Sequence, residues 1–329
     1  MSEDVRPMEE VLAAEEPGFA RALEAVLTAD TSTLSQLLAD EPELARQRSA
    51  AHHESTLLHY VAANGVETAL QVSPGTIYQF LVSCSDVERT SAVERAMNVP
   101  KLLIDAGAEV DALCRTYGGG PHQTTLNLLV SSAHPHNAGV QETLARVMVQ
   151  SGAAVDGLED DQSPLLTALA FGYWRTVAAL VGLGARCDGL IPAAASGELE
   201  LVEGYFPAGA LKDEVGTTSL PWFEVAKDPG VVAQQALVYA SLCGHERVVR
   251  FLLERGVDVD AIPPGSHVTA GALHTAALAG HRSVVECLLE GGADPTKREP
   301  RYGGDPQSWA EHGGDEAIVE RLREASSDR

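Results

Sequence analysis

Apolar residues recur at helical spacing in short segments of this chain, and each segment stops at a glycine. The best of these segments continue with a small or apolar residue and then an acidic turn. They read LLIDAGAEVD at 102–111, VMVQSGAAVD at 147–156, ALVGLGARCD at 179–188, FLLERGVDVD at 251–260 and CLLEGGADPT at 287–296. A 3.6-residue apolar period predicts a helix with one buried face, and a following glycine predicts where it ends.

The spacing of these glycines indicates an internal repeat. They stand at Gly107, Gly152, Gly184, Gly256 and Gly292, with separations of 45, 32, 72 and 36 residues. Because 72 is twice 36, one degenerate copy is expected between Gly184 and Gly256, and LIPAAASGELELVEGYF at 190–206 fills that place. A recurring period in this range is typical of solenoids.

A second apolar segment precedes most of these glycines. It reads STLLHYVAANG at 55–65, SPLLTALAFG at 163–172, QALVYASLCGHERVV at 235–249 and GALHTAALAGHRSVV at 271–285, with a weaker copy, DPQSWAEHGG, at 305–314. The complete unit is therefore helix, glycine turn, helix, glycine stop and an extended acidic finger, with a period of about 33 residues.

This unit resembles the ankyrin repeat, whose pattern is roughly G-x-T-P-L-H-x-A-A-x-x-G-H-x-x-V-V-x-L-L-L-x-x-G-A-D-x-N. Residues 272–296 match it closely, and residues 236–261 almost as well. The resemblance implies an all-α solenoid of about seven stacked helix–turn–helix units, caps included. It also implies that His59 and His274 bond to the backbone of neighbouring loops, and that His245 and His281, each after a turn glycine, are structural.

The expected organisation is a single solenoid over residues 18–325. An acidic lead-in at 1–17 precedes it and a tail at 326–329 follows it. Two irregular stretches, at about 66–98 and 207–230, are too long for ordinary fingers and are interpreted as insertions.

Charge narrows the classes of partner. Asp and Glu number 47 against 23 Lys and Arg, so the net charge is −24. Such a charge opposes binding to nucleic acid or to anionic lipid and favours a partner with a basic surface. No apolar run is long enough to span a membrane, and the acidic N-terminus does not look like a signal peptide. We therefore expect a cytoplasmic protein.

The sequence contains no motif for catalysis or metal binding. It has neither a GxSxG nucleophile elbow nor a glycine-rich phosphate loop. His122, His134 and His136 lie near Cys114 in the chain, but their spacing does not fit a zinc site. The five cysteines are far apart and form no CxxC pair, which fits a reducing compartment. We predict no catalytic residue, no metal and no cofactor.

The resemblance implies a non-enzymatic protein–protein interaction module that binds through its concave face and finger loops. Transferred position by position, the family pattern predicts partner contacts on the first helices and their turns. These candidates are Tyr60, Asn64, Phe171, Tyr173, Trp174, Tyr239, Cys243, Thr275 and Trp309.

Two alternatives remain open. The insertions could roof a pocket and make the protein a small-molecule binder or an enzyme, with Tyr60, His122, His134 and Tyr239 beneath the roof. Alternatively, the insertions could form a contact between two copies of the chain. The sequence identifies neither the partner nor the oligomeric state.

Overall fold

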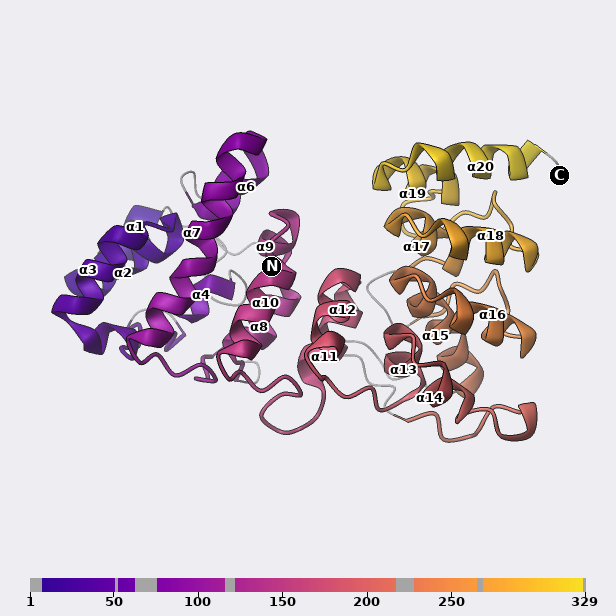
Figure 1. Ribbon diagram of the computed structural model, residues 1–329, viewed down its shortest axis with the longest axis horizontal. Helices are drawn as coiled ribbons and strands as arrows, with labels where there is room; N and C mark the ends of the chain where they lie inside the picture. Colours follow the sequence, from indigo (N-terminus) through magenta and orange to yellow (C-terminus); the bar gives the residue numbers. More distant parts are fainter. Residues whose placement is uncertain are drawn as a thin grey trace. The chain divides into compact units, whose positions relative to one another are not determined.

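Helices make up the whole regular structure of the described residues. The computed structural model (Figure 1) describes residues 8–50, 53–62, 76–115, 122–216, 228–264 and 269–327. These residues contain α-helices, short 3-10 turns and two isolated β-bridges, Arg48 with Thr56 and Cys114 with Gln123. The chain divides into two compact units, Met1–Pro164 and Leu165–Arg329. The single solenoid expected over 18–325 stays a prediction.

The N-terminal unit contains three helix pairs. They are α2 (Pro17–Thr28) with α3 (Thr31–Asp40), α4 (His59–Ala62) with α7 (Asp86–Asp105), and α8 (Thr125–Ser131) with α10 (Gln141–Gln150). The first helices α2, α4 and α8 contact in order, and so do the second helices α3, α7 and α10. The acidic lead-in includes a further helix, α1 (Met8–Ala13), which packs on α2.

The described part of the first insertion is helical. It forms α6 (Ile77–Ser83) and the larger, N-terminal part of α7. Ser85 and Glu88 cap α7 reciprocally, so the helix begins in the insertion and continues without a break through LLID at 102–105. A short helix, α9 (Ala133–Asn137), follows α8. The insertion therefore lengthens the second helix of its repeat.

The C-terminal unit is the more regular stack. Its pairs are α11 (Ser163–Phe171) with α12 (Trp174–Gly182), α13 (Leu190–Ser196) with α14 (Leu199–Glu203), α15 (Pro229–Cys243) with α16 (Glu246–Glu254), α17 (Ala272–Ala279) with α18 (Arg282–Glu290), and α19 (Pro306–Gly313) with α20 (Glu316–Ser327). Helix α11 starts just before the boundary between the units. Helices α13, α15, α17 and α19 form one row, and α14, α16, α18 and α20 form the other (Figure 1). Helix α12 packs against α13 and α15.

Small side chains allow the first helices to pack closely. Ala240, Ala276 and Ala277 are completely buried where α15 and α17 stack. Gly244 and Gly280 end these two helices with φ of 85° and 77°, a region that residues with a Cβ rarely adopt. The predicted helix ends are therefore confirmed at these positions. The corresponding Gly65 lies outside the described residues.

Candidate functional site

The turns of the C-terminal repeats are tied together by histidines. His245 Nε2 donates to the Ala195 carbonyl at 2.8 Å, and His281 Nε2 donates to the Leu242 carbonyl at 3.0 Å. Each ring also lies against the turn glycine of the preceding repeat. A Cβ at Gly244 would stand 2.7 Å from His281 Nδ1. Both histidines thus have the predicted structural role, and burial lowers the pKa of each.

Two other histidines hold the finger loops. His59 Nε2 donates to the Ala112 carbonyl at 2.9 Å, and His274 Nε2 donates to the Lys297 carbonyl at 3.0 Å. Both bonds confirm what the resemblance implied. Burial lowers the pKa of His59 to about 4, so its ring is neutral at pH 7. Its Nδ1 can then accept the Thr56 N–H at 3.0 Å.

A buried carboxylate shapes the finger after α18. Glu299 is 1% exposed. Its Oε1 accepts N–H groups from Tyr302 at 2.9 Å and Gly304 at 3.0 Å, and its Oε2 accepts the Arg301 N–H at 2.7 Å. Burial alone would raise the pKa of Glu299, but these backbone donors stabilise the charged form and the pKa ends below its usual value. Three backbone N–H groups of the finger therefore converge on one ionised carboxylate.

This finger displays an aromatic side chain to solvent. The side chain of Tyr302 is 76% exposed, although its backbone is held by Glu299. The guanidinium carbon of Arg301 lies 5.2 Å from the Tyr302 ring centroid. Tyr302 is absent from the candidates predicted from sequence. The available signal was the YGG that occurs ten residues after both Gly107 and Gly292. Its first copy, 117–119, lies outside the described residues.

The predicted partner-binding residues differ in accessibility. Phe171, Trp174, Cys243 and Trp309 are half-buried, whereas Tyr60, Tyr173, Tyr239 and Thr275 are buried and Asn64 lies outside the described residues. The four buried side chains therefore pack inside their units and are not exposed at the surface. A direct role in binding stays a prediction for every residue in the set.

Trp174 is placed beside the histidine-tied turns by the way α12 packs. Its ring meets the His281 ring edge-on, with centroids 5.2 Å apart. The Arg175 guanidinium lies 4.8 Å from the centroid of the same indole ring. Trp309, on α19, makes a similar edge contact with His274 at 5.7 Å. These half-buried rings are fixed in place, which suits them to contact a partner at low entropic cost.

The residues of the alternative pocket fall in both units. Tyr60, His122 and His134 belong to the N-terminal unit and Tyr239 to the C-terminal unit. His122 is exposed, His134 is half-buried, and both tyrosines are 1% exposed. A pocket formed by all four residues stays a prediction.

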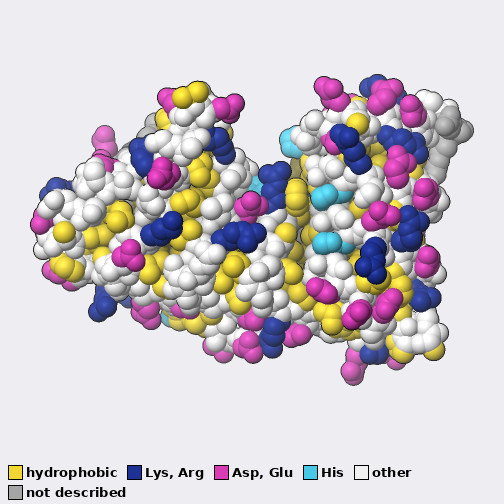
Figure 2. Space-filling view, viewed as in Figure 1, with side chains coloured by type: hydrophobic (Ala, Val, Ile, Leu, Met, Phe, Trp, Pro, Cys, Tyr) yellow, Lys and Arg dark blue, Asp and Glu magenta, His cyan; other side chains and the backbone are white. Residues whose placement is uncertain are grey.

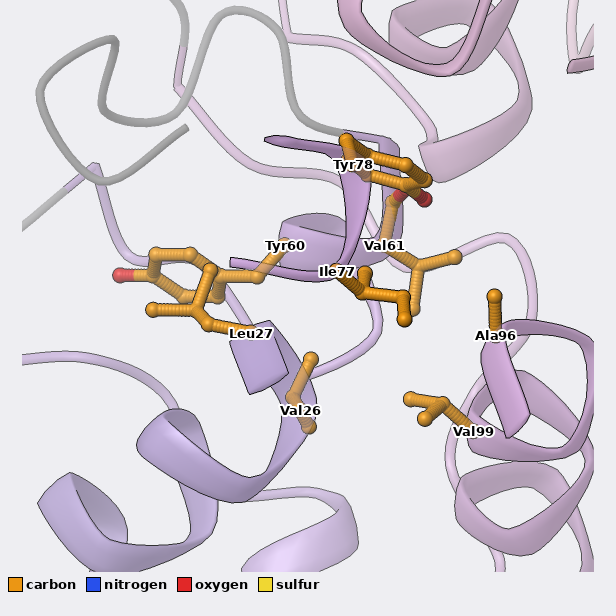
Figure 3. A pocket seen from close by; sticks show the side chains of 8 residues that line it. All are labelled: Val26, Leu27, Tyr60, Val61, Ile77, Tyr78, Ala96 and Val99. Carbon is orange, nitrogen blue, oxygen red and sulfur yellow. The ribbon is translucent and has the colours of Figure 1, made fainter. Parts of the chain in front are cut away.

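Tyr60 does line a small cavity inside the N-terminal unit. Figure 3 shows eight side chains converging on it from α2, α4, α6 and α7, among them Tyr78, whose hydroxyl donates to the Val61 carbonyl at 2.6 Å. The cavity volume is about 10 Å³, room for about one water molecule. This cavity is too small for a metabolite.

The described residues provide neither a metal site nor a membrane-spanning helix. Within the described ranges, no group of three or more His, Cys, Asp or Glu side chains is arranged to hold a metal ion. Nor is any helix in those ranges long and apolar enough to cross a bilayer.

Comparison with known proteins identifies the repeat. Residues 190–299, from α13 to the finger after α18, match the family model for ankyrin repeats in three copies. No curated protein matches the chain. The chain therefore contains ankyrin repeats, and the resemblance inferred from its sequence is confirmed. With the all-helical structure, this supports the predicted ankyrin-repeat solenoid.

Proposed function

We propose that this protein is a non-enzymatic interaction module whose C-terminal unit binds a protein partner. Ankyrin repeats are generally protein–protein interaction modules. The proposed surface consists of the finger at 299–304 and the half-buried rings of Trp174 and Trp309. A cytoplasmic location is part of the same proposal.

The observation that carries this proposal is the exposed Tyr302 on a finger with a fixed backbone. Aromatic side chains make up only 5% of the chain, and most of the described ones are buried or half-buried. Leaving a tyrosine 76% exposed forgoes the gain from burying its ring. Tyrosine is enriched among residues that dominate binding energy at interfaces, so a partner that covers this ring recovers that gain.

Charge favours a basic partner. The C-terminal unit contains 23 Asp and Glu residues against 14 Lys and Arg. Acidic side chains are spread over the visible face of the unit (Figure 2). Such a field speeds the encounter with a positively charged surface and makes binding sensitive to salt.

The test is affinity capture from native lysate at low and high salt, followed by titration of the captured protein in purified form. Tyr302→Ala is expected to weaken binding at least about tenfold, as for a dominant aromatic anchor. Leu201→Ala is the control, because Leu201 is also an exposed apolar residue (48%) but lies on α14 in the second-helix row. Equal affinity of wild type and Tyr302→Ala would exclude the finger as the anchor. Failure to capture any protein at either salt would oppose the proposed function as a whole.

A further inference from the structure

The N-terminal unit has an open pocket whose lining differs from the rest of this acidic protein. The pocket has a volume of about 430 Å³ and is lined by Arg46, Arg48, Thr56, Gly107 and Glu109. That volume is within the range of small-ligand pockets. The same unit carries only nine Lys and Arg against 24 Asp and Glu. Two arginines in the lining of one pocket therefore distinguish it from the rest of the unit.

Backbone carbonyls, not carboxylates, position both guanidinium groups. Arg46 Nε donates to the Gly107 carbonyl at 2.7 Å. Arg48 Nη1 donates to the carbonyls of Glu54 at 2.8 Å and Leu113 at 2.7 Å. Among the described residues, neither guanidinium forms an ion pair. Each keeps its full charge and further N–H donors for a ligand.

The contact of Arg46 with Gly107 departs from the repeat pattern. A Cβ on Gly107 would stand 2.9 Å from Arg46 Nη2. At the equivalent glycines of the other repeats, a Cβ would meet no atom within 4 Å; these are Gly152, Gly184, Gly256 and Gly292. The repeat fold itself therefore does not require a guanidinium at this position. In this one loop, the absence of a side chain makes room for it.

We propose that Arg46 and Arg48 form a binding site for an oxyanion, a phosphate or carboxylate group carried by a small molecule or by a partner. Guanidinium groups bind such anions through charge-assisted, often paired, hydrogen bonds. Glu109, which also lines the pocket, repels excess negative charge. The site therefore favours a singly charged group, or one with a hydrogen-bond donor beside the anion. This site is separate from the surface proposed for the C-terminal unit.

The test uses inorganic phosphate and succinate as probes, each titrated into the ¹⁵N-labelled full chain with ionic strength held constant by sodium chloride. Saturable shifts of the Thr56 and Gly107 amide signals are expected with at least one probe. Phosphate alone would identify a phosphoryl group as the ligand, and succinate alone a carboxylate. No saturable shift with either probe would overturn the proposal.

Charge variants separate a specific site from general attraction. Arg46→Gln with Arg48→Gln is expected to weaken binding at least about tenfold, because charge-assisted hydrogen bonds are lost. Arg21→Gln with Arg95→Gln removes the same charge from exposed positions in the same unit and should leave binding nearly unchanged. Glu109→Gln should strengthen phosphate binding by a few-fold. Equal weakening by the two double variants would refute the site.

A pair of glycine variants tests the geometry without changing charge. Gly107→Ala displaces the Arg46 guanidinium, whereas Gly152→Ala imposes a similar backbone strain in open space, since φ is 97° and 104° at the two positions. Binding should weaken several-fold in the first variant and stay unchanged in the second. Circular dichroism should show that both variants remain folded. Unchanged binding by folded Gly107→Ala would contradict the role of Arg46.

Discussion

Replacing Glu299 with alanine removes the acceptor for three backbone N–H groups in the last described finger, those of Arg301, Tyr302 and Gly304. A hydrogen bond to a charged group contributes about 1.5–3 kcal/mol, but N–H groups near the surface regain water when the carboxylate is lost. We therefore expect a loss of about 3 kcal/mol in the free energy of unfolding, which is less than the sum of three such bonds. For a unit of this size, that corresponds to a fall in Tm of about 6–12 °C.

The loss of stability should first affect the finger that contains Glu299 and the adjacent helices, because each repeat is stabilised chiefly by its neighbours. Hydrogen exchange should show faster exchange of the Tyr302 and Gly304 amides and of α19 and α20, with α15 nearly unchanged. Glu299→Gln keeps one acceptor oxygen and should lose about half as much stability. Glu290→Ala, an exposed carboxylate in the same repeat, should change stability by less than about 0.5 kcal/mol.

The stability that Glu299 contributes should depend on pH. The folded pKa of Glu299 lies below its unfolded value, so its contribution is present above about pH 4.5 and is lost as pH falls through the folded pKa. The difference between wild type and Glu299→Ala should shrink over that acidic range. An unchanged Tm together with unchanged exchange of the finger amides would refute the stabilising role of the carboxylate.

Two further predictions concern His281 and His59. In chemical denaturation, Gly244→Ala should destabilise the protein by about 1–3 kcal/mol more than Gly256→Ala. The reason is that φ is positive at both glycines but only Gly244 lies against a ring, that of His281. Equal losses would show that the His281 ring moves aside at no cost. The folded pKa of His59, about 4, lies below the unfolded value of about 6.5. As the pH decreases from 6.5 to 4, the free energy of unfolding should therefore fall by up to about 1.4 kcal/mol per pH unit. His59→Gln should remove that slope. An identical pH dependence in this variant would assign the slope to other groups.

Much of the local structure follows from the sequence alone. Apolar spacing and turn glycines predicted the helix ends at Gly244 and Gly280, since a positive φ is a local requirement that the residue itself reveals. His59 and His274 bond to finger backbones as the resemblance implied. The surface candidates were less accessible than expected. The repeat pattern assigns each residue a position in the repeat, but it does not determine whether its side chain is exposed or buried.

Contacts between distant segments were decided only by the tertiary structure. The end of the first insertion continues into its repeat as one helix, α7, which the repeat pattern did not predict. Trp174 meets His281 because α12 packs against α13 and α15, and Arg46 meets Gly107 across 61 residues of sequence. Periodicity describes the interactions of a residue with near neighbours in the chain. Contacts between side chains of different repeats depend on how the helices stack. Both proposed sites depend on that stacking or on the geometry of the fingers.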